Sequence, residues 1–108
     1  MRDDKVYLQD IVESINIIQQ HIGDKTEFEF SKEVLLQDAV IRRFEIIGEA
    51  AMKVSKAFKQ SHPEIEWQLM VDMRNKLIHE YFGLSASTIY QTIHKDLPLL
   101  KQKLVSLF

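Results

Sequence analysis

Residues 36–58, LQDAVIRRFEIIGEAAMKVSKAF, decide the fold class of this chain because their apolar residues recur at steps of three and four. That spacing places them along one side of an α-helix. The stripe consists of Leu36, Val40, Phe44, Ile47, Ala51, Val54 and Phe58. We therefore expect one long helix over residues 32–60, capped at its start by Ser31 and ending ahead of His62 and Pro63.

Small residues occupy the middle of this predicted helix. Gly48, Ala50 and Ala51 leave little side-chain bulk there, although glycine costs about 1 kcal/mol of helix propensity. Such residues let a neighbouring helix come close. The sequence therefore predicts either a crowded helix crossing or a dimer seam at this point.

The same apolar period marks three further segments of the chain. It predicts helices over residues 4–22, 66–81 and 86–107. Residues 25–30 are acidic and aromatic, and the pattern assigns no structure to them. Four helices joined by short connections predict an all-α fold, an antiparallel four-helix bundle that forms one domain over residues 1–108.

Residues typical of helix ends flank these segments. Asp3 or Asp4 can cap the first helix, and Gly23 can end it. Ser85 can cap the last helix, and Pro98 should kink that helix midway, because proline removes a backbone donor and clashes with the preceding turn. The sequence therefore predicts where several of the helices begin and end.

The composition excludes several classes of protein. With no cysteine, the chain has neither a disulfide framework nor a thiolate metal site. His21, His62 and His94 have no second ligand at metal spacing, so we expect no metal and no other cofactor. The first residues lack the apolar run of a signal peptide, and no stretch approaches the ~20 apolar residues of a membrane span. We expect a cytoplasmic protein without membrane contact.

The charge is small overall and unevenly distributed. The net charge of -2 counts against a general nucleic-acid binder. Residues 1–41 hold four Lys and Arg against nine Asp and Glu, whereas residues 42–108 hold ten against seven. An anionic ligand should therefore approach the second part. Its basic residues at helical spacing are Arg42, Arg43, Lys53, Lys56 and Lys59, for which a solvated helix face is the simpler interpretation.

Residues 74–81, RNKLIHEY, combine a permanent cation, an amide, an imidazole and a phenol. On a helix, Asn75 and His79 lie nearly on one line, while Arg74 and Tyr81 share a neighbouring line. Arg74 and His79 are about 140° apart around the helix axis. They converge on one ligand only if the arginine bends round or a second subunit completes the site.

This combination suits RNA cleavage without a metal ion. The imidazole of His79 can accept the proton of a 2′-hydroxyl or protonate the leaving oxygen near neutral pH. The guanidinium of Arg74 can hold two phosphate oxygens and stabilise charge in the transition state. The spacing alone also fits a structural role, with Arg74 paired to Asp72 or Glu80 and the histidine capping the helix end.

The motif Arg74-Asn75-x3-His79-x-Tyr81 closely resembles the signature of the HEPN superfamily, and specifically of HepT-type toxins. The resemblance extends to three other segments in the same order along the chain. They are DAVIRRFEIIGEA at residues 38–50, PEIEW at residues 63–67 and DLP at residues 96–98. The chain is thereby identified as a member of this superfamily over most of its length.

The resemblance implies a dimer of four-helix bundles in which Arg74, Asn75 and His79 of both subunits line a shared cleft and cleave RNA without a metal. It also implies a partner, a minimal nucleotidyltransferase antitoxin of the MntA type that inactivates such toxins by adenylylating the motif tyrosine, here Tyr81. Nucleotide phosphates attached to this phenol would fill the anion site near Arg74 and block a substrate phosphate.

Two acidic residues match acidic positions of the family pattern. Asp38 and Glu49 could each orient a basic residue in the cleft, although Glu49 could equally form an ion pair with Lys53, and we slightly favour that ion pair. Phe44 and Trp67 lie on apolar stripes and should belong to the core, so RNA would be recognised mainly by charge and shape.

Three functions compete on this evidence. The favoured one is an endoribonuclease toxin in which His79 is the general acid or base, Arg74 binds the phosphate and Asn75 positions the site. The second is a noncatalytic HEPN module that binds nucleotide or serves as partner subunit of the nucleotidyltransferase, which the acidic balance favours somewhat. The third is a purely structural helical dimer. The sequence leaves the substrate open between transfer and messenger RNA.

Overall fold

The computed structural model describes the backbone of residues 3–79 and 85–108, and their side chains except those of residues 77–79. Helix α1, Asp4–Ile22, covers the predicted residues. The Asp3 carboxylate accepts a hydrogen bond from the backbone N–H of Lys5 at 3.0 Å, and Gly23 ends the helix at φ 49°. This left-handed conformation suits glycine, so both predicted helix ends are confirmed.

A short helix, α2, Glu27–Lys32, occupies the connector to which the sequence assigned no structure. Thr26 and Glu29 form a reciprocal capping box, with hydrogen bonds of 3.1 and 2.9 Å between each side chain and the other residue's backbone N–H. The prediction that Ser31 caps the long helix is wrong, because Ser31 lies inside α2 and its hydroxyl donates to the Phe28 carbonyl at 2.6 Å.

The long helix predicted over residues 32–60 is two helices, α3, Val34–Lys53, and α4, Lys56–Ser61. The cause of the break is a contact with α1. The backbone N–H of Ser55 donates to one Asp4 carboxylate oxygen at 2.8 Å, and its hydroxyl donates to the other at 2.7 Å. The Ser55 oxygen in turn accepts from the N–H of Phe58 at 3.2 Å and caps α4.

Helix α5, Trp67–His79, begins one residue later than the predicted 66–81, and the last two predicted positions lie outside the described residues. The last predicted helix, 86–107, is divided rather than only kinked, into α6, Ala86–Lys95, and α7, Leu97–Val105. Pro98 stands in the first turn of α7, where its missing N–H costs least, so the chain breaks just before it. The predicted Ser85 cap is confirmed.

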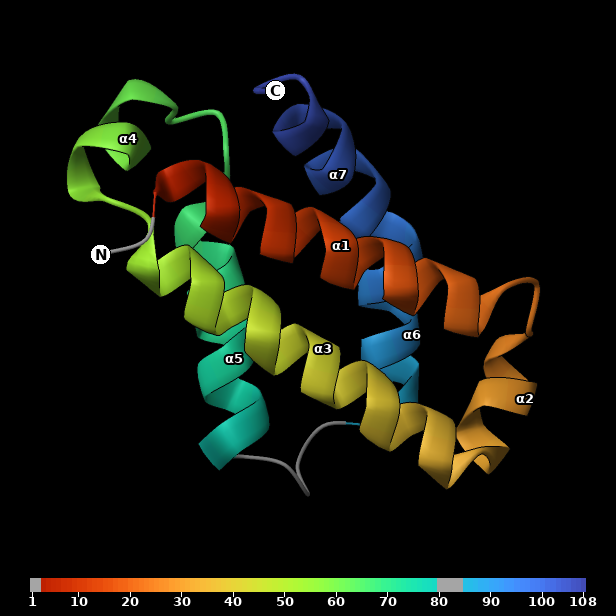
Figure 1. The fold of residues 1–108 in the computed structure, drawn as a ribbon. Helices are drawn as coiled ribbons and strands as arrows, with labels where there is room; N and C mark the ends of the chain where they lie inside the picture. Colours follow the sequence, from red (N-terminus) through yellow and green to blue (C-terminus); the bar gives the residue numbers. More distant parts are fainter. Residues whose placement is uncertain (1–2, 80–84) are drawn as a thin grey trace.

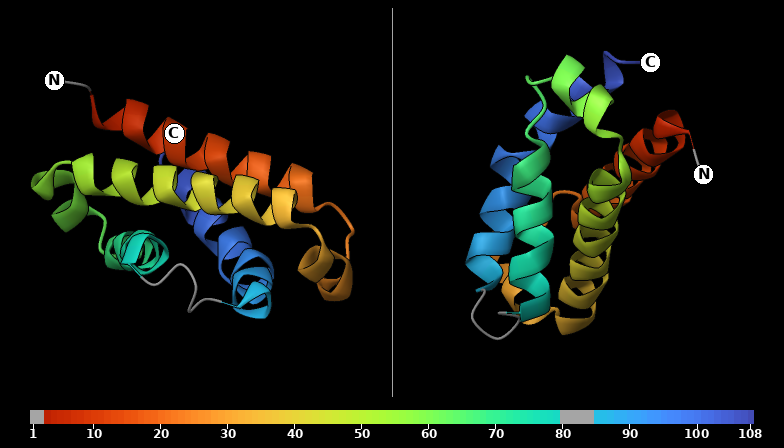
Figure 2. Two further views of the ribbon diagram at one scale, coloured as in Figure 1. Left: turned by 90° about the horizontal axis from the view of Figure 1, so that it is seen from below. Right: turned by 90° about the vertical axis from the view of Figure 1, so that its left-hand side faces the viewer.

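The helices form two layers, with α1 and α3 side by side in one, and α5 and α6 in the other (Figures 1 and 2). Helix α3 is central, because it packs extensively against both α1 and α5. The core between the layers is apolar and includes Leu8, Ile11, Ile15, Ile18, Val40, Phe44, Ile47, Ala51, Trp67, Met70, Ile89, Ile93, Leu97 and Leu104. The predicted all-α bundle is confirmed. In the described residues, no helix combines the length and the apolarity that crossing a lipid bilayer requires.

Candidate active site at the crossing of helices α3 and α5

Gly48 lies where α3 and α5 are in closest contact. A Cβ atom built on Gly48 would collide with the Cβ of Arg74, and would lie 2.7 Å from its Cγ and 2.9 Å from the Met70 carbonyl oxygen. The Met70 contact is with backbone, so a rotamer change could not relieve it. The crowded crossing expected from the small residues is therefore present within one subunit, and it fixes where the stem of Arg74 leaves α5.

The guanidinium of Arg74 is held by the adjacent residue. Its Nη1 donates a hydrogen bond to Oδ1 of Asn75 at 3.0 Å, and both side chains are half-buried. Among the described residues, the buried Nε of Arg74 has no hydrogen-bond partner. Asp72, one of the two acids considered as an ion-pair partner, instead accepts from Gln68 at 2.8 Å. Among the described residues, the guanidinium has the one hydrogen bond to Asn75, and an anion could bind the Nη donors that this bond does not use.

An open depression of about 360 Å³ lies between α3 and α5 and is lined by Glu49, Met52, Lys53 and Arg74. Helix α3 contributes the first three residues and α5 the last. The ion pair slightly favoured between Glu49 and Lys53 is not present in the described part of the chain, where ion pairs are found at other positions. The depression therefore combines two cations and one carboxylate that form no ion pair with one another.

The remaining predicted site residues differ in how far the structure places them. Helix α5 continues from Arg74 to His79, whose side chain lies outside the described set, as does all of Tyr81. Asp38 is exposed on α3, about 16 Å along the helix axis from Glu49. The structure thus brings Arg74, Asn75 and Glu49 together and leaves Asp38 apart from them.

Lys53 and Met52 are site residues that sequence reasoning missed. Lys53 was assigned to a solvated helix face together with four other basic residues, because helical spacing alone does not distinguish between them. Its place beside Arg74 depends on the angle at which α5 crosses α3. Within the described residues, no group of three His, Cys, Asp or Glu side chains could hold a metal ion.

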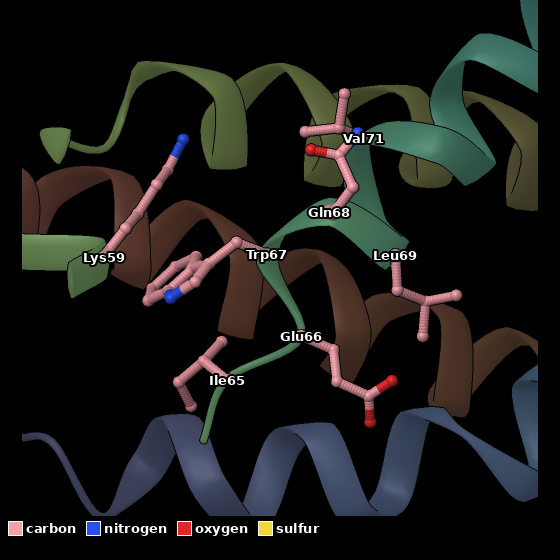
Figure 3. Close-up of a pocket in the computed structure, with 7 residues that line it drawn as sticks. All are labelled: Lys59, Ile65, Glu66, Trp67, Gln68, Leu69 and Val71. Carbon is pink, nitrogen blue, oxygen red and sulfur yellow. The ribbon is translucent and has the colours of Figure 1, made fainter. Parts of the chain in front are cut away.

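A second depression, of about 510 Å³, opens at the start of α5 (Figure 3). Trp67 is 8% exposed, and its indole N–H donates to the His62 carbonyl at 3.0 Å, so this tryptophan belongs to the core as predicted. The lining is mostly apolar and includes the Glu66 carboxylate, with Lys59 as its one cation among the described residues. It lacks the paired cations of the α3–α5 depression, which is therefore the better anion site.

Comparison with known proteins agrees with the motif. Residues 11–107 match the family model described as "Ribonuclease HepT-like". The chain is 43% identical over 102 residues to "Probable ribonuclease HepT" of Thermococcus cleftensis, covering 94% of this chain and 93% of that protein. It is 34% identical over 103 residues to a "Putative RNase" of Caldanaerobacter subterraneus subsp. tengcongensis, covering 95% and 92%.

A third relative is larger than this chain. It is the "Gamma-glutamylcyclotransferase and putative RNase" of Methanocaldococcus jannaschii, 41% identical over 106 residues, which are 98% of this chain but 48% of that protein. The chain thus spans about half the length of this relative. No solved structure matches the chain. The family match over residues 11–107 and the 43% identity to a relative over 94% of this chain show that this chain belongs to the HepT-like ribonuclease family.

Proposed function

We propose that this chain is the endoribonuclease toxin of a toxin–antitoxin pair and cleaves RNA without a metal ion. The observation that carries the proposal is the placement of Arg74. Arg74 is half-buried, its guanidinium donates a hydrogen bond to Asn75, and the residue lines an open depression, in a chain of a ribonuclease family. A fixed cation at a solvent-accessible site can bind a phosphate without first paying the full cost of ordering the side chain.

The proposed reaction uses the 2′-hydroxyl of the RNA as nucleophile. Its oxygen attacks the neighbouring phosphorus, the bond from phosphorus to the 5′-oxygen breaks, and the products carry a 2′,3′-cyclic phosphate and a 5′-hydroxyl. His79 accepts the 2′-hydroxyl proton or donates a proton to the departing 5′-oxygen, and water carries out the other of these two proton transfers. Arg74 neutralises the charge that builds up on the phosphoryl oxygens, and Asn75 positions Arg74.

The hydrogen bond from Arg74 to Asn75 affects whether Arg74 and His79 of one subunit can contact the same ligand. Asn75 and His79 lie on nearly one line of α5, so an arginine turned toward Asn75 is also turned toward that line. This bending favours convergence of the two groups within one subunit. We nevertheless propose that two such sites face each other across a homodimer, on the basis of the shared cleft implied by the family resemblance.

Regulation by a nucleotidyltransferase antitoxin of the MntA type is part of the proposal. Adenylylation of Tyr81, seven residues beyond Arg74, would tether a phosphate close to the guanidinium. The tethered anion would then compete with substrate. A Tyr81→Phe chain should keep its ribonuclease activity and resist inactivation by the antitoxin with ATP, which mass spectrometry and an RNA cleavage assay can establish together.

The deciding experiment is incubation of the unmodified full chain with total cellular RNA in excess EDTA, beside His79→Ala. We expect cleavage by the wild type and a loss of about 10²-fold or more in the variant, the usual contribution of a general acid or base. Circular dichroism should show the same helix content for both chains. RNA left intact by wild-type protein, shown by mass to lack adenylylation, would contradict the ribonuclease proposal.

The net charge of -2 favours a second candidate, a noncatalytic module that serves as partner of the nucleotidyltransferase. Such a module would leave RNA intact in the same experiment and would still bind the nucleotidyltransferase. Its binding would change little in His79→Ala. The two candidates therefore predict opposite results for the wild type.

A further inference from the structure

We infer that the depression between α3 and α5 binds a second phosphate of the RNA, next to the scissile one, through Lys53. The inference rests on the proposed ribonuclease function and names a substrate-binding residue outside the motif on α5. Lys53 and Arg74 line the same depression but come from different helices. Two cations facing one open space are suited to consecutive phosphates of a single strand.

The ammonium of Lys53 is available for a ligand. Lys53 is the last residue of α3, its side chain is exposed, and it forms no hydrogen bond or ion pair with any described residue. Two of the other basic side chains are instead held in ion pairs. Lys25 pairs with Glu33 at 3.0 Å, and Arg42 with Glu45 at 3.6 Å. Lys53 would therefore release no protein partner when it binds a phosphate.

The helix crossing places Lys53 on the opposite side of Arg74 from His79. Helix α5 extends five residues, about 7.5 Å, from Arg74 to His79, and α3 extends the same length from Gly48 to Lys53. The C-terminal end of α3 lies beside the start of α5, away from the end of α5 that carries His79 (Figure 1). An RNA strand held at Arg74 for reaction with His79 would thus continue toward Lys53.

Glu49 limits the strength of this site and provides a second test of it. Its half-buried carboxylate lines the same depression and repels a phosphate there. If the depression binds RNA, neutralising Glu49 should tighten binding, whereas neutralising Lys53 should weaken it. If these residues only form a solvated helix face, neither substitution should change RNA affinity beyond the general effect of net charge.

Lys56 offers a matched control. It is an exposed lysine three residues from Lys53, on α4, and it is not among the residues that line either of the two depressions described above. Lys56→Gln makes the same change in net charge as Lys53→Gln. The difference between the two variants therefore reports the location of the charge and not its total.

The experiment measures binding of a fluorescein-labelled single-stranded RNA by anisotropy, in the full-length His79→Ala chain so that no cleavage intervenes. Adding Lys53→Gln should raise Kd about threefold to tenfold and lower the slope of log Kd against log salt by about 0.7, the value for one phosphate contact in a single strand. Adding Glu49→Gln should lower Kd, and Lys56→Gln should change it less than twofold.

Each outcome supports or overturns a specific claim. Equal Kd values for the Lys53→Gln and Lys56→Gln chains would overturn the second phosphate site and leave the ribonuclease proposal intact. RNA binding too weak to saturate in the parent chain would also overturn the second phosphate site, whereas the cleavage experiment in EDTA decides the ribonuclease proposal separately. If Lys53 only stabilises the C-terminal end of α3, its substitution will lower the melting temperature without changing the salt slope, which also overturns the inference.

Discussion

Helices α1 and α5 both pack against α3, yet the surfaces they bury differ in chemistry. Helix α1 buries six apolar side chains and a single polar one, Ser14, and its start is capped by Asp3. In the described part of α5, only Trp67 and Met70 are buried apolar residues, and the half-buried positions include Arg74 and Asn75. Helix α1 thus mainly supplies stability. Helix α5 also carries the polar groups of the candidate site.

The largest expected effect comes from α1. Leu8 is 1% exposed, so Leu8→Ala should lower the free energy of unfolding by about 2–5 kcal/mol through lost burial and a cavity. Leu35→Ala removes the same atoms from a side chain that is 85% exposed. It should change the free energy of unfolding by less than about 0.5 kcal/mol. Urea titrations measure both. Similar losses for the two variants would contradict the division between scaffold and site.

A smaller effect on stability is expected at the crossing itself. Gly48→Ala should cost about 1–3 kcal/mol, because the new Cβ must push away Arg74 and the Met70 backbone. A gain of about 1 kcal/mol in helix propensity opposes this loss. RNA cleavage should fall as well, because Arg74 is displaced. Thermal unfolding and a cleavage assay on one preparation test this, and unchanged cleavage would show that Arg74 tolerates movement.

Asn75→Ala should separate function from stability more clearly. Removing the acceptor of the Arg74 bond should lower the cleavage rate about tenfold and barely alter the melting temperature. Gln68→Ala is the control, since it removes a similar side-chain hydrogen bond, to Asp72, on the same helix. Equal rates for the two variants would remove the positioning role of Asn75.

The smallest effect concerns the contact between α1 and α4. Hydrogen bonds from the side chain and backbone of Ser55 hold the pKa of the Asp4 carboxyl below its ordinary value. A lowered folded-state pKa adds stability that is fully present above the ordinary value and is lost as pH falls through the folded value. Asp4→Asn should therefore lower the urea midpoint at pH 7 more than at pH 3. A gap independent of pH would contradict this account.

Local sequence predicted those parts of the fold that depend on local interactions. The bounds of α1, its Asp3 cap and the Ser85 cap follow from short-range chemistry. The capping box of Thr26 and Glu29 is likewise local and corresponds to a T-x-x-E pattern in the sequence. The break after α3 was not predictable in this way, because Ser55 forms its decisive bonds with Asp4, 51 residues earlier.

The candidate site also contains residues that local sequence predicts and residues that depend on tertiary contacts. The placing of Arg74, Asn75 and His79 on one helix follows from the sequence pattern, and the importance of Gly48 follows from a glycine in the middle of a long apolar stripe. The place of Lys53 depends on how two helices cross, which no one-dimensional pattern contains. Lys53 and Met52 are therefore the part of the site for which the structure was needed.

The contact of Gly48 with Arg74 also has a consequence for sequence variation. The collision would involve the Cβ of residue 74, an atom that every amino acid except glycine has. Shortening Arg74 to a smaller residue would therefore not make room for a side chain at position 48. Among relatives that keep this crossing, glycine at 48 should persist even where the cation at 74 has been replaced and the activity lost, so this glycine would outlast the function that it supports.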